Sequence, residues 1–255
     1  MFIDSHTHLY LPEFSADIDT TISTCIDLNI QKLLLPNIDS SSIEPLANLC
    51  KNYPQICYPM VGLHPCSVKE NYMEELSTIE PFIRKINAIA IGEIGIDLFW
   101  DKSTLEIQKQ AFIMQINWAK KYNLPIVIHA RDSFNELFDV LDEHNDKNLF
   151  GVFHCFTGNA EQASKIIDYK GFKLGIGGVV TFKNSGLDKT LSTISLEHLV
   201  IETDAPYLAP HPYRGKQNSS VHLILVAEKL ASIYKCSLNE IAITTSKNTI
   251  DVFKL

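Results

Sequence analysis

The sequence alternates short aliphatic runs with longer stretches of helical spacing, and this alternation constrains the fold more than any other feature. Strands that alternate with helices form parallel sheets, because each helix carries the chain back across the sheet. We therefore predict an α/β protein, either a (β/α)8 barrel of TIM type or a doubly wound open sheet. The apolar runs recur eight times, at Phe2–Ser5, Lys32–Leu35, Ile56–Val61, Ala88–Ile91, Pro125–Ile128, Phe150–Phe153, Phe172–Gly175 and His198–Ile201.

Three later segments show the clearest helical pattern. Apolar side chains in Leu105–Tyr122 recur at intervals of three and four residues, which predicts a helix. Val221–Tyr234 and Leu238–Phe253 are expected to be two helices that close the fold. Eight strands in 255 residues fit one barrel, and no linker or low-complexity segment divides the chain. We therefore expect a single barrel domain over residues 1–255, with the barrel favoured over the open sheet.

The charge balance limits how the protein can bind other molecules. There are 22 Lys and Arg residues against 30 Asp and Glu residues, which gives a net charge of −8. This balance excludes a protein that binds nucleic acid through bulk positive charge, but it allows local positive charge or charge carried by metal ions. We expect no obligate protein partner.

The cysteines and the apolar runs indicate the compartment. The six cysteines are scattered and form no C-x-x-C pair, which favours reduced thiols over a disulfide framework. The first residues, Met1 to His6, lack the pattern of a signal peptide, and no apolar run approaches the roughly 18 residues of a membrane span. We expect a cytoplasmic protein without membrane association.

Two histidines follow the first apolar run, in Asp4-Ser5-His6-Thr7-His8. Side chains alternate across a strand, so Asp4, His6 and His8 are expected to share one face. Two neutral imidazoles beside a carboxylate can chelate a metal ion. An H-x-H pair also occurs by chance, and an incidental polar strand end is then the alternative.

Four more residues of metal-ligating types stand at or just past the ends of later runs, namely Glu93, His129, His154 and Asp204. Taken singly, such residues are more often structural histidines, helix caps or partners in ion pairs. In a barrel, however, the carboxyl ends of all strands meet at one mouth, where active sites are built. Six donors are more than one tetrahedral ion needs, so we predict two divalent ions that share a carboxylate.

Positive charge is expected near this mouth despite the acidic balance. Arg131 follows His129 by two residues, and Arg214 and Lys216 lie in the long connection Thr203–Ser220. Such side chains suit an anionic substrate such as a phosphate ester, although Arg131 could instead pair with its neighbour Asp132. His64 also follows a strand, and we expect it to line the mouth and contact substrate without ligating metal.

The ordered set of motifs resembles the TatD-type metal-dependent deoxyribonucleases. The motifs run from Ser5-His6-Thr7-His8-Leu9 through Gly62-Leu63-His64-Pro65, Gly92-Glu93-Ile94-Gly95-Ile96-Asp97, Val127-Ile128-His129-Ala130-Arg131 and His154-Cys155-Phe156-Thr157-Gly158 to Glu202-Thr203-Asp204-Ala205-Pro206-Tyr207. The resemblance implies a TIM-type barrel that hydrolyses phosphodiester bonds of DNA. It also implies that the metal ligands are His6, His8, Glu93, His129, His154 and Asp204, with Glu93 bridging two ions. The chain departs from the family where Ser219 and Ser220 follow Asn218, which leaves the substrate contacts of that loop open.

These observations predict a divalent-metal-dependent deoxyribonuclease that uses a metal-activated water. Glu93 and Asp204 are the expected catalytic residues, Asp204 by accepting the proton of the water, and the expected substrate is single-stranded or 3′-ended DNA cleaved from an end. Imidazole-rich ligation favours Zn²⁺ or Mn²⁺ over Mg²⁺. Asp4 and Glu202 are expected to orient ligand imidazoles. The alternatives are a hydrolase of a small amide, lactone or phosphoester on the same barrel, and a metal-containing binding protein without catalysis.

Overall fold

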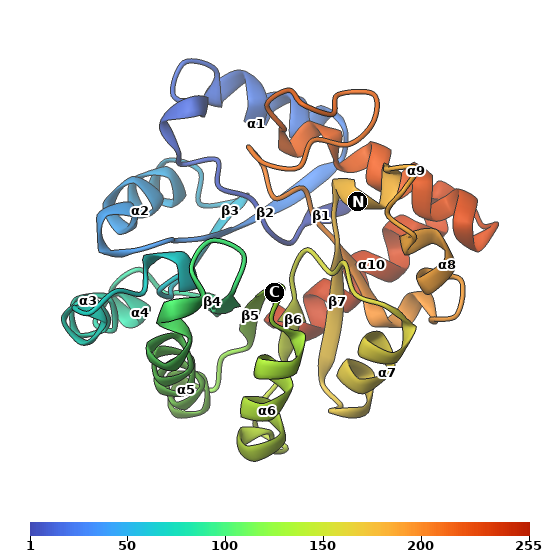
Figure 1. Ribbon diagram of the computed structural model, residues 1–255. Helices are drawn as coiled ribbons and strands as arrows, with labels where there is room; N and C mark the ends of the chain where they lie inside the picture. The colour runs from blue at the N-terminus through green and yellow to red at the C-terminus, as the bar shows by residue number, and fades with distance from the viewer.

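Eight parallel strands form an inner ring that helices cover from outside in the computed structural model, which describes residues 1–255 (Figure 1). The strands are β1 (Phe2–Asp4), β2 (Ile30–Pro36), β3 (Cys57–Met60), β4 (Ile91–Asp97), β5 (Ile126–Arg131), β6 (Gly151–Phe153), β7 (Phe172–Ile176) and β8 (Leu199–Ile201). The helices are α1 (Ile18–Asp27), α2 (Ile43–Asn52), α3 (Tyr72–Ile79), α4 (Phe82–Lys85), α5 (Leu105–Tyr122), α6 (Phe134–His144), α7 (Ala160–Asp168), α8 (Leu187–Leu191), α9 (Leu223–Tyr234) and α10 (Leu238–Phe253).

The ring is closed by two short contacts between two sheets. The sheets have the strand orders β1-β2-β3 and β4-β5-β6-β7-β8, and all their pairs are parallel. A single bridge between Val61 and Ile91 joins β3 to β4. On the other side, the Ser5 N–H donates to the Ile201 carbonyl at 3.0 Å and joins β8 to β1. The barrel prediction is therefore confirmed and the open-sheet alternative is wrong.

The helices and strands lie where the sequence predicts them, except that β4 is shifted toward the carboxyl end. The helix expected over Leu105–Tyr122 is α5, and the two closing helices are α9 and α10. The fourth strand was expected to end at Ile91, but β4 begins there and runs on for seven buried residues. The pattern failed because two glycines and Glu93 interrupt the apolar run. As a result, Glu93 lies inside a strand and not past its end.

Gly95 explains why β4 can run so close to β5. Its φ is +137°, and a Cβ at this position would lie 2.2 Å from the carbonyl oxygen of His129. Only glycine allows this approach. The register pairs Gly95 with His129, so Glu93 and His129 are held on adjacent strands near the same level of the barrel.

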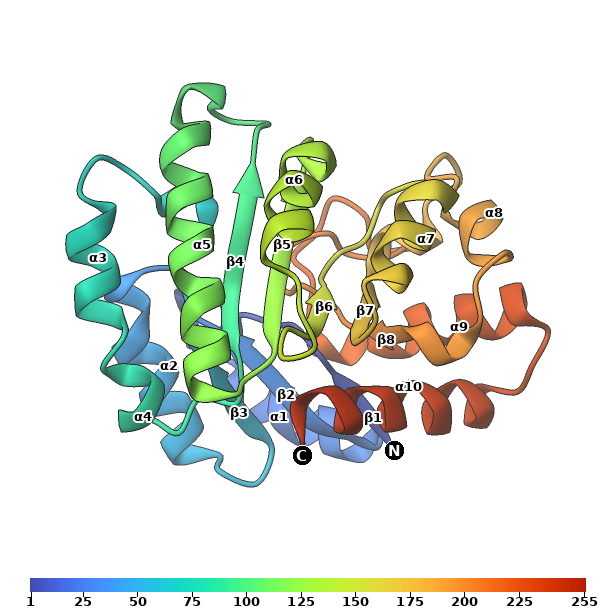
Figure 2. The same ribbon diagram turned by 90° about the horizontal axis from the view of Figure 1, so that it is seen from below.

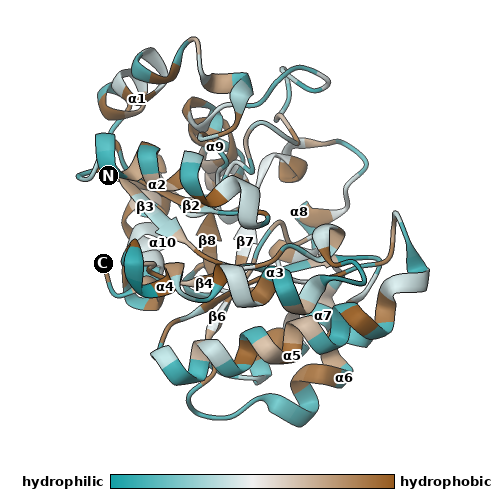
Figure 3. Ribbon diagram, turned by 90° about the vertical axis from the view of Figure 1, so that its left-hand side faces the viewer, coloured by the Kyte–Doolittle hydropathy of each residue, from teal (hydrophilic) through white to brown (hydrophobic).

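The amino-terminal ends of the strands are filled by apolar side chains, and the end of α10 covers them. Figure 2 shows α10 lying across this end of the barrel, and β4 points away from it. We call this group the base cluster; it consists of Ile3, Leu34, Met60, Ala90, Val127, Val152, Val200, Val252 and Phe253. The larger core of 57 buried residues lies mainly between the strands and the outer helices. In Figure 3, hydrophilic and hydrophobic residues alternate along these helices, as expected for helices with one face on the barrel.

None of the helices combines the length and the apolar character that a bilayer crossing requires.

Candidate metal centre and active site

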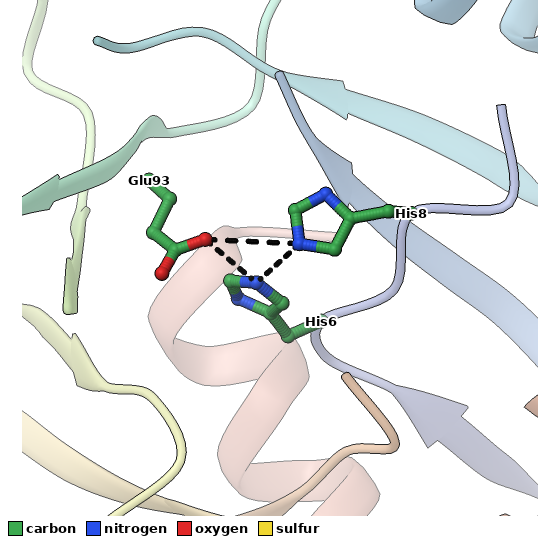
Figure 4. Close-up of side chains that lie close together, drawn as sticks. All are labelled: His6, His8 and Glu93. Atoms are coloured by element: carbon green, nitrogen blue, oxygen red, sulfur yellow. Dashed lines mark hydrogen bonds and ion pairs between the residues drawn. The ribbon is translucent and has the colours of Figure 1, made fainter. Parts of the chain in front are cut away.

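A buried carboxylate, that of Glu93, lies at the centre of the polar side chains in the barrel mouth. Its two oxygens face different imidazoles. Oε2 lies 3.2 Å from His6 Nε2 and 3.7 Å from His8 Nε2. Dashed lines mark these two contacts in Figure 4. Oε1 lies 2.7 Å from His129 Nδ1 and 2.7 Å from His154 Nε2. The carboxylate therefore contacts one pair of histidines through each oxygen. The two pairs also touch, because the rings of His6 and His154 are stacked with centroids 3.9 Å apart.

Asp204 joins the first of these two sets. Its Oδ1 lies 3.6 Å from His6 Nε2 and 3.6 Å from His8 Nε2. The two histidine nitrogens are themselves only 3.3 Å apart. All six residues predicted as ligands thus meet at one place. They come from β4, β5 and the segments that follow β1, β6 and β8.

The hydrogen bonds around His8 leave its inner nitrogen free to bind a cation. The Tyr10 hydroxyl donates to the Pro36 carbonyl at 2.8 Å, so its oxygen can accept from His8 Nδ1 at 3.1 Å. A neutral imidazole carries one proton, and here it is on Nδ1. His8 Nε2 therefore presents a lone pair to His6 and Glu93.

His129 is oriented by a residue that the sequence analysis did not assign, Asp97. His129 Nε2 lies 2.9 Å from Asp97 Oδ2, and its Nδ1 lies 2.7 Å from Glu93 Oε1. Burial disfavours the charged ring, but these two carboxylates outweigh it and raise the pKa of His129 in the ion-free site. A cation bound at Nδ1 would replace the proton there, while Asp97 keeps the one on Nε2. Burial opposes ionisation of Asp97, but the hydrogen bond from His129 and its charge outweigh that effect and lower the pKa of the carboxyl to about 2. Alternation offered a signal, because Glu93, Gly95 and Asp97 share one face of a strand.

His154 is placed by Glu202, as expected. Glu202 is fully buried, and its Oε1 lies 3.4 Å from His154 Nδ1 and accepts the Cys155 N–H. A Cβ on Gly175 would lie 2.3 Å from the Glu202 carboxylate, so this glycine makes room for it. Burial disfavours the charged ring, but Glu93 and Glu202 outweigh it and raise the pKa of His154 well above its usual range in the ion-free site. A cation bound at Nε2 would replace the proton that faces Glu93.

Asp4 differs from its expected role. It contacts backbone and hydroxyl groups instead of an imidazole ring, because it accepts from Thr203 N at 2.9 Å, Thr203 Oγ1 at 2.6 Å and His6 N at 3.4 Å. Burial raises the pKa of Asp4 to about 7 against the lowering effect of these hydrogen bonds. Asp4 therefore ties the end of β1 to the segment after β8 and positions His6 through its backbone.

His64 directs its Nε2 toward Glu93 from the rim of the centre. The Cys66 N–H donates to His64 Nδ1 at 3.0 Å, so the proton of the neutral ring is on Nε2. That nitrogen lies 3.3 Å from Glu93 Oε1. In this state His64 is a hydrogen-bond donor. His64, Glu93 and His129 also lie close enough together to hold a cation, so the non-ligating role of His64 stays a prediction.

The donor set fits divalent cations. Three imidazoles, those of His8, His129 and His154, each direct one ring nitrogen toward Glu93, and two carboxylates supply negative charge. His6 Nδ1 and His154 Nδ1 are buried without a hydrogen-bond partner. Burial disfavours the Glu93 carboxylate, yet the positive charge that it favours on the surrounding imidazoles, His154 first, outweighs burial and holds the pKa of Glu93 well below its usual range in the ion-free site. The carboxylate is thus ionised and can bind cations from both of its oxygens.

The three basic residues predicted to bind substrate occupy different places. Arg131 lies at the rim with its Cζ 3.7 Å from the centre of the Phe99 ring, and it forms no ion pair with Asp132. Arg214 is exposed, with its Cζ 4.5 Å from the centre of the Phe182 ring. Lys216 is exposed in the same loop. Of the three, only Arg131 lies on a strand, β5, which also carries His129.

The end of the long loop is anchored where the sequence departs from the family pattern. Asn218 is buried and its Nδ2 donates to the carbonyls of Thr203 and Tyr207, both at 2.7 Å. Ser220 Oγ lies 3.0 Å from Thr7 Oγ1. Asn218 and Ser220 therefore tie the loop to the segments that carry Asp204 and His6.

Known proteins with similar sequences and structures cover the whole chain. The family model described as TatD related DNase matches residues 3–254. An uncharacterized metal-dependent hydrolase of Bacillus subtilis, YabD, is 35% identical over 256 residues, with 100% of both chains covered. The crystal structure of YjjV, a TatD homolog from Escherichia coli K12, has a TM-score of 0.93 at 29% identity and covers 100% of this chain and 98% of that one. A TatD family hydrolase from Entamoeba histolytica shares the fold, with a TM-score of 0.85 at 23% identity over 98% of this chain and 97% of its own.

Proposed function

The chain belongs to the TatD related DNase family and is a metal-dependent hydrolase, and we propose that it cleaves phosphodiester bonds of DNA at a site for two divalent ions. One observation carries this proposal. The two oxygens of Glu93 face two separate sets of donors, which is the arrangement of a carboxylate that bridges two ions. His6, His8 and Asp204 would hold one ion, and His129 and His154 would hold the other.

The residues around the centre are suited to displacement at phosphorus. Divalent ions held here would supply Lewis-acid activation of a water and neutralise charge on the phosphoryl oxygens. Asp204 is the proton acceptor in our proposal, because its Oδ1 faces the side of the centre where His6 and His8 lie. His64 Nε2–H would donate to a phosphoryl oxygen, and the exposed Arg131 would attract the anionic strand. Arg214 and Lys216 would contact more distant phosphates.

The nature of the donors also suggests which ions bind. Four imidazole nitrogens and two carboxylates suit Zn²⁺ or Mn²⁺ better than Mg²⁺, which prefers a shell of oxygen ligands. Elemental analysis of protein purified without added metal tests this point. We expect close to two equivalents of Zn or Mn per chain.

Digestion of end-labelled oligonucleotides tests the substrate. Single- and double-stranded DNA of the same sequence is incubated with Zn²⁺, Mn²⁺ or Mg²⁺, and the products are separated by length. We expect the single strand to be shortened stepwise from its 3′ end. Glu93→Gln should be inactive, whereas the matched control Glu228→Gln, an exposed residue of α9, should equal the wild type.

Two results would contradict the proposal. One is the absence of nucleotide release with every metal, combined with turnover of a small amide, lactone or phosphomonoester. The other is full nuclease activity of Glu93→Gln, because a bridging carboxylate cannot be replaced by an amide without loss of charge.

A further inference from the structure

Two large aromatic side chains are exposed beside the metal centre. Trp100 is 71% exposed and Phe99 is 50% exposed, in the loop that follows β4. Their rings meet edge to face, with centroids 4.9 Å apart. The Arg131 guanidinium carbon lies 3.7 Å from the Phe99 ring centre and 5.4 Å from that of Trp100. We call Phe99, Trp100 and Arg131 the aromatic platform.

The aromatic platform is attached to the centre through Asp97. The backbone N–H groups of Phe99 and Trp100 both donate to Asp97 Oδ1, at 3.0 and 3.4 Å. The other oxygen of Asp97 holds His129. Arg131 follows His129 by two residues in the same strand, β5. The platform and the histidine are therefore fixed relative to each other by one carboxylate and one strand.

A cavity of about 740 Å³ opens next to the aromatic platform, between the start of α6 and the start of α7. This volume lies in the range of small-molecule sites and admits a base with its sugar. Its lining is mainly polar, with hydrogen-bonding groups that can meet a base edge. Among the lining residues are Phe99, Arg131, Asn135, Glu136, Thr157 and Asn159.

We propose that the aromatic platform is a subsite that stacks an unpaired nucleobase of the strand whose phosphate lies at Glu93. This inference rests on the proposed function, and it adds the requirement that the substrate base be unstacked and unpaired. Aromatic and guanidinium groups bind the π-face of any base, so stacking here is independent of sequence. A base inside a duplex has no free face, and the platform therefore selects single strands. Tryptophan and arginine are also common in interfaces with protein partners, but such an interface does not require them to be tied to a candidate metal ligand, His129.

Abasic substrates separate the aromatic platform from the phosphodiester chemistry. We compare KM for a single-stranded oligonucleotide with KM for the same strand bearing abasic sites in its last three nucleotides. The wild type should bind the abasic strand about 10-fold more weakly, since stacking on one aromatic side chain is worth this much. Trp100→Ala should raise KM about 10-fold for the normal strand and only slightly for the abasic strand. Its kcat should be almost unchanged. Trp100→Phe should restore most of the loss. Ile243→Ala, which removes a 59% exposed side chain on α10, is the matched control and should equal the wild type on both strands.

Tryptophan fluorescence supplies a readout that does not need turnover. The chain has two tryptophans, and Trp118 is 7% exposed, so stacking of a base should quench Trp100 selectively. Glu93→Gln protein titrated with the normal oligonucleotide should show this quenching, and the abasic strand should not. If the wild type cleaves both strands with equal KM and no quenching occurs, the platform proposal is wrong while the nuclease proposal stands. If quenching occurs but no metal supports cleavage, the nuclease proposal is wrong and a base-binding site remains.

Discussion

The two ends of the barrel are built from the same strands and differ in almost every physical respect. In β5, Val127 belongs to the base cluster, whereas His129 faces Glu93. The two residues share one face of the strand and are separated by about 6.6 Å along it. In the first segment, Ile3 lies in the base cluster and His6 lies in the mouth. A single layer of side chains therefore separates residues that stabilise the fold from residues that carry chemistry.

The difference has an energetic origin. The base cluster gains from removing apolar surface from water, and its side chains have no polar atoms that need partners. The mouth buries a carboxylate and several imidazoles, which costs free energy unless they are paired with each other or with cations. Changes at the mouth should thus alter activity more than stability, and changes at the base should do the reverse. The predictions below test this separation.

The largest effect on activity is expected from Glu93→Ala. Loss of the carboxylate that contacts both sets of histidines should lower hydrolysis by at least about 1,000-fold and reduce bound metal. The melting temperature of the metal-free protein should fall little or rise, because a costly buried charge has been removed. Activity assays, elemental analysis and calorimetry of the same preparation measure all three quantities. A metal-free variant that fails to fold would show that the mouth also stabilises the barrel.

The largest effect on stability is expected from Phe253→Ala. This side chain is 3% exposed under the strands, and its truncation leaves a cavity in the base cluster. Such truncations cost about 3–5 kcal/mol of unfolding free energy, and in a chain of this size each kcal/mol lowers the melting temperature by about 2–4 °C. At 25 °C, kcat/KM should equal that of the wild type. A fall in kcat/KM at 25 °C in fully folded protein would mean that the two ends of the barrel are coupled.

An intermediate effect is expected from Asp97→Asn, which lies at the mouth but does not face Glu93. The amide holds His129 less firmly than the carboxylate does, so metal affinity should fall by about 10–100-fold. Competition with a metal chelator measures this change, and Asp139→Asn on the exposed side of α6 is the matched control. Unaltered metal affinity would argue that the backbone of β5 is enough to place the histidine.

The smallest effect is expected from Met60→Leu in the base cluster. The two side chains have similar volumes, so the unfolding free energy should change by less than about 1.5 kcal/mol. Metal affinity and kcat/KM should be unchanged. Denaturant titration and the chelator assay check both points. A clear change in metal affinity would mean that the base cluster also contributes to the metal centre at the mouth.

The sequence predicted the mouth better than the contacts around it. The periodicity of the apolar runs gave the eight strands, and the family motifs pointed to the six residues that meet at the centre. β4 was misplaced because Gly92, Glu93 and Gly95 do not resemble a buried strand, although every residue of it is buried. The strand is favoured there by the close approach to β5, which is a tertiary effect.

The residues that orient the histidines were harder to find. The Tyr10 hydroxyl contacts both His8 and Pro36, and no spacing rule links these three positions. Asp97 belongs to the Gly92–Asp97 motif, but its role depends on its contact with His129 on the neighbouring strand, which spacing within the motif does not reveal. The aromatic platform was equally hard to find from the sequence. Arg131 stacks on Phe99 because β4 pairs with β5, and this pairing is a tertiary contact.

The position of α10 has a consequence for folding during translation. The base cluster brings Ile3 into one small volume with Phe253, so β1 cannot be sealed until residues near 253 have left the exit tunnel. During the time in which the intervening segments are made, the apolar amino ends of the finished strands have no cover. Such exposed surface promotes association between growing chains. The nascent chain therefore stays open to such association until its last helix emerges and completes the barrel.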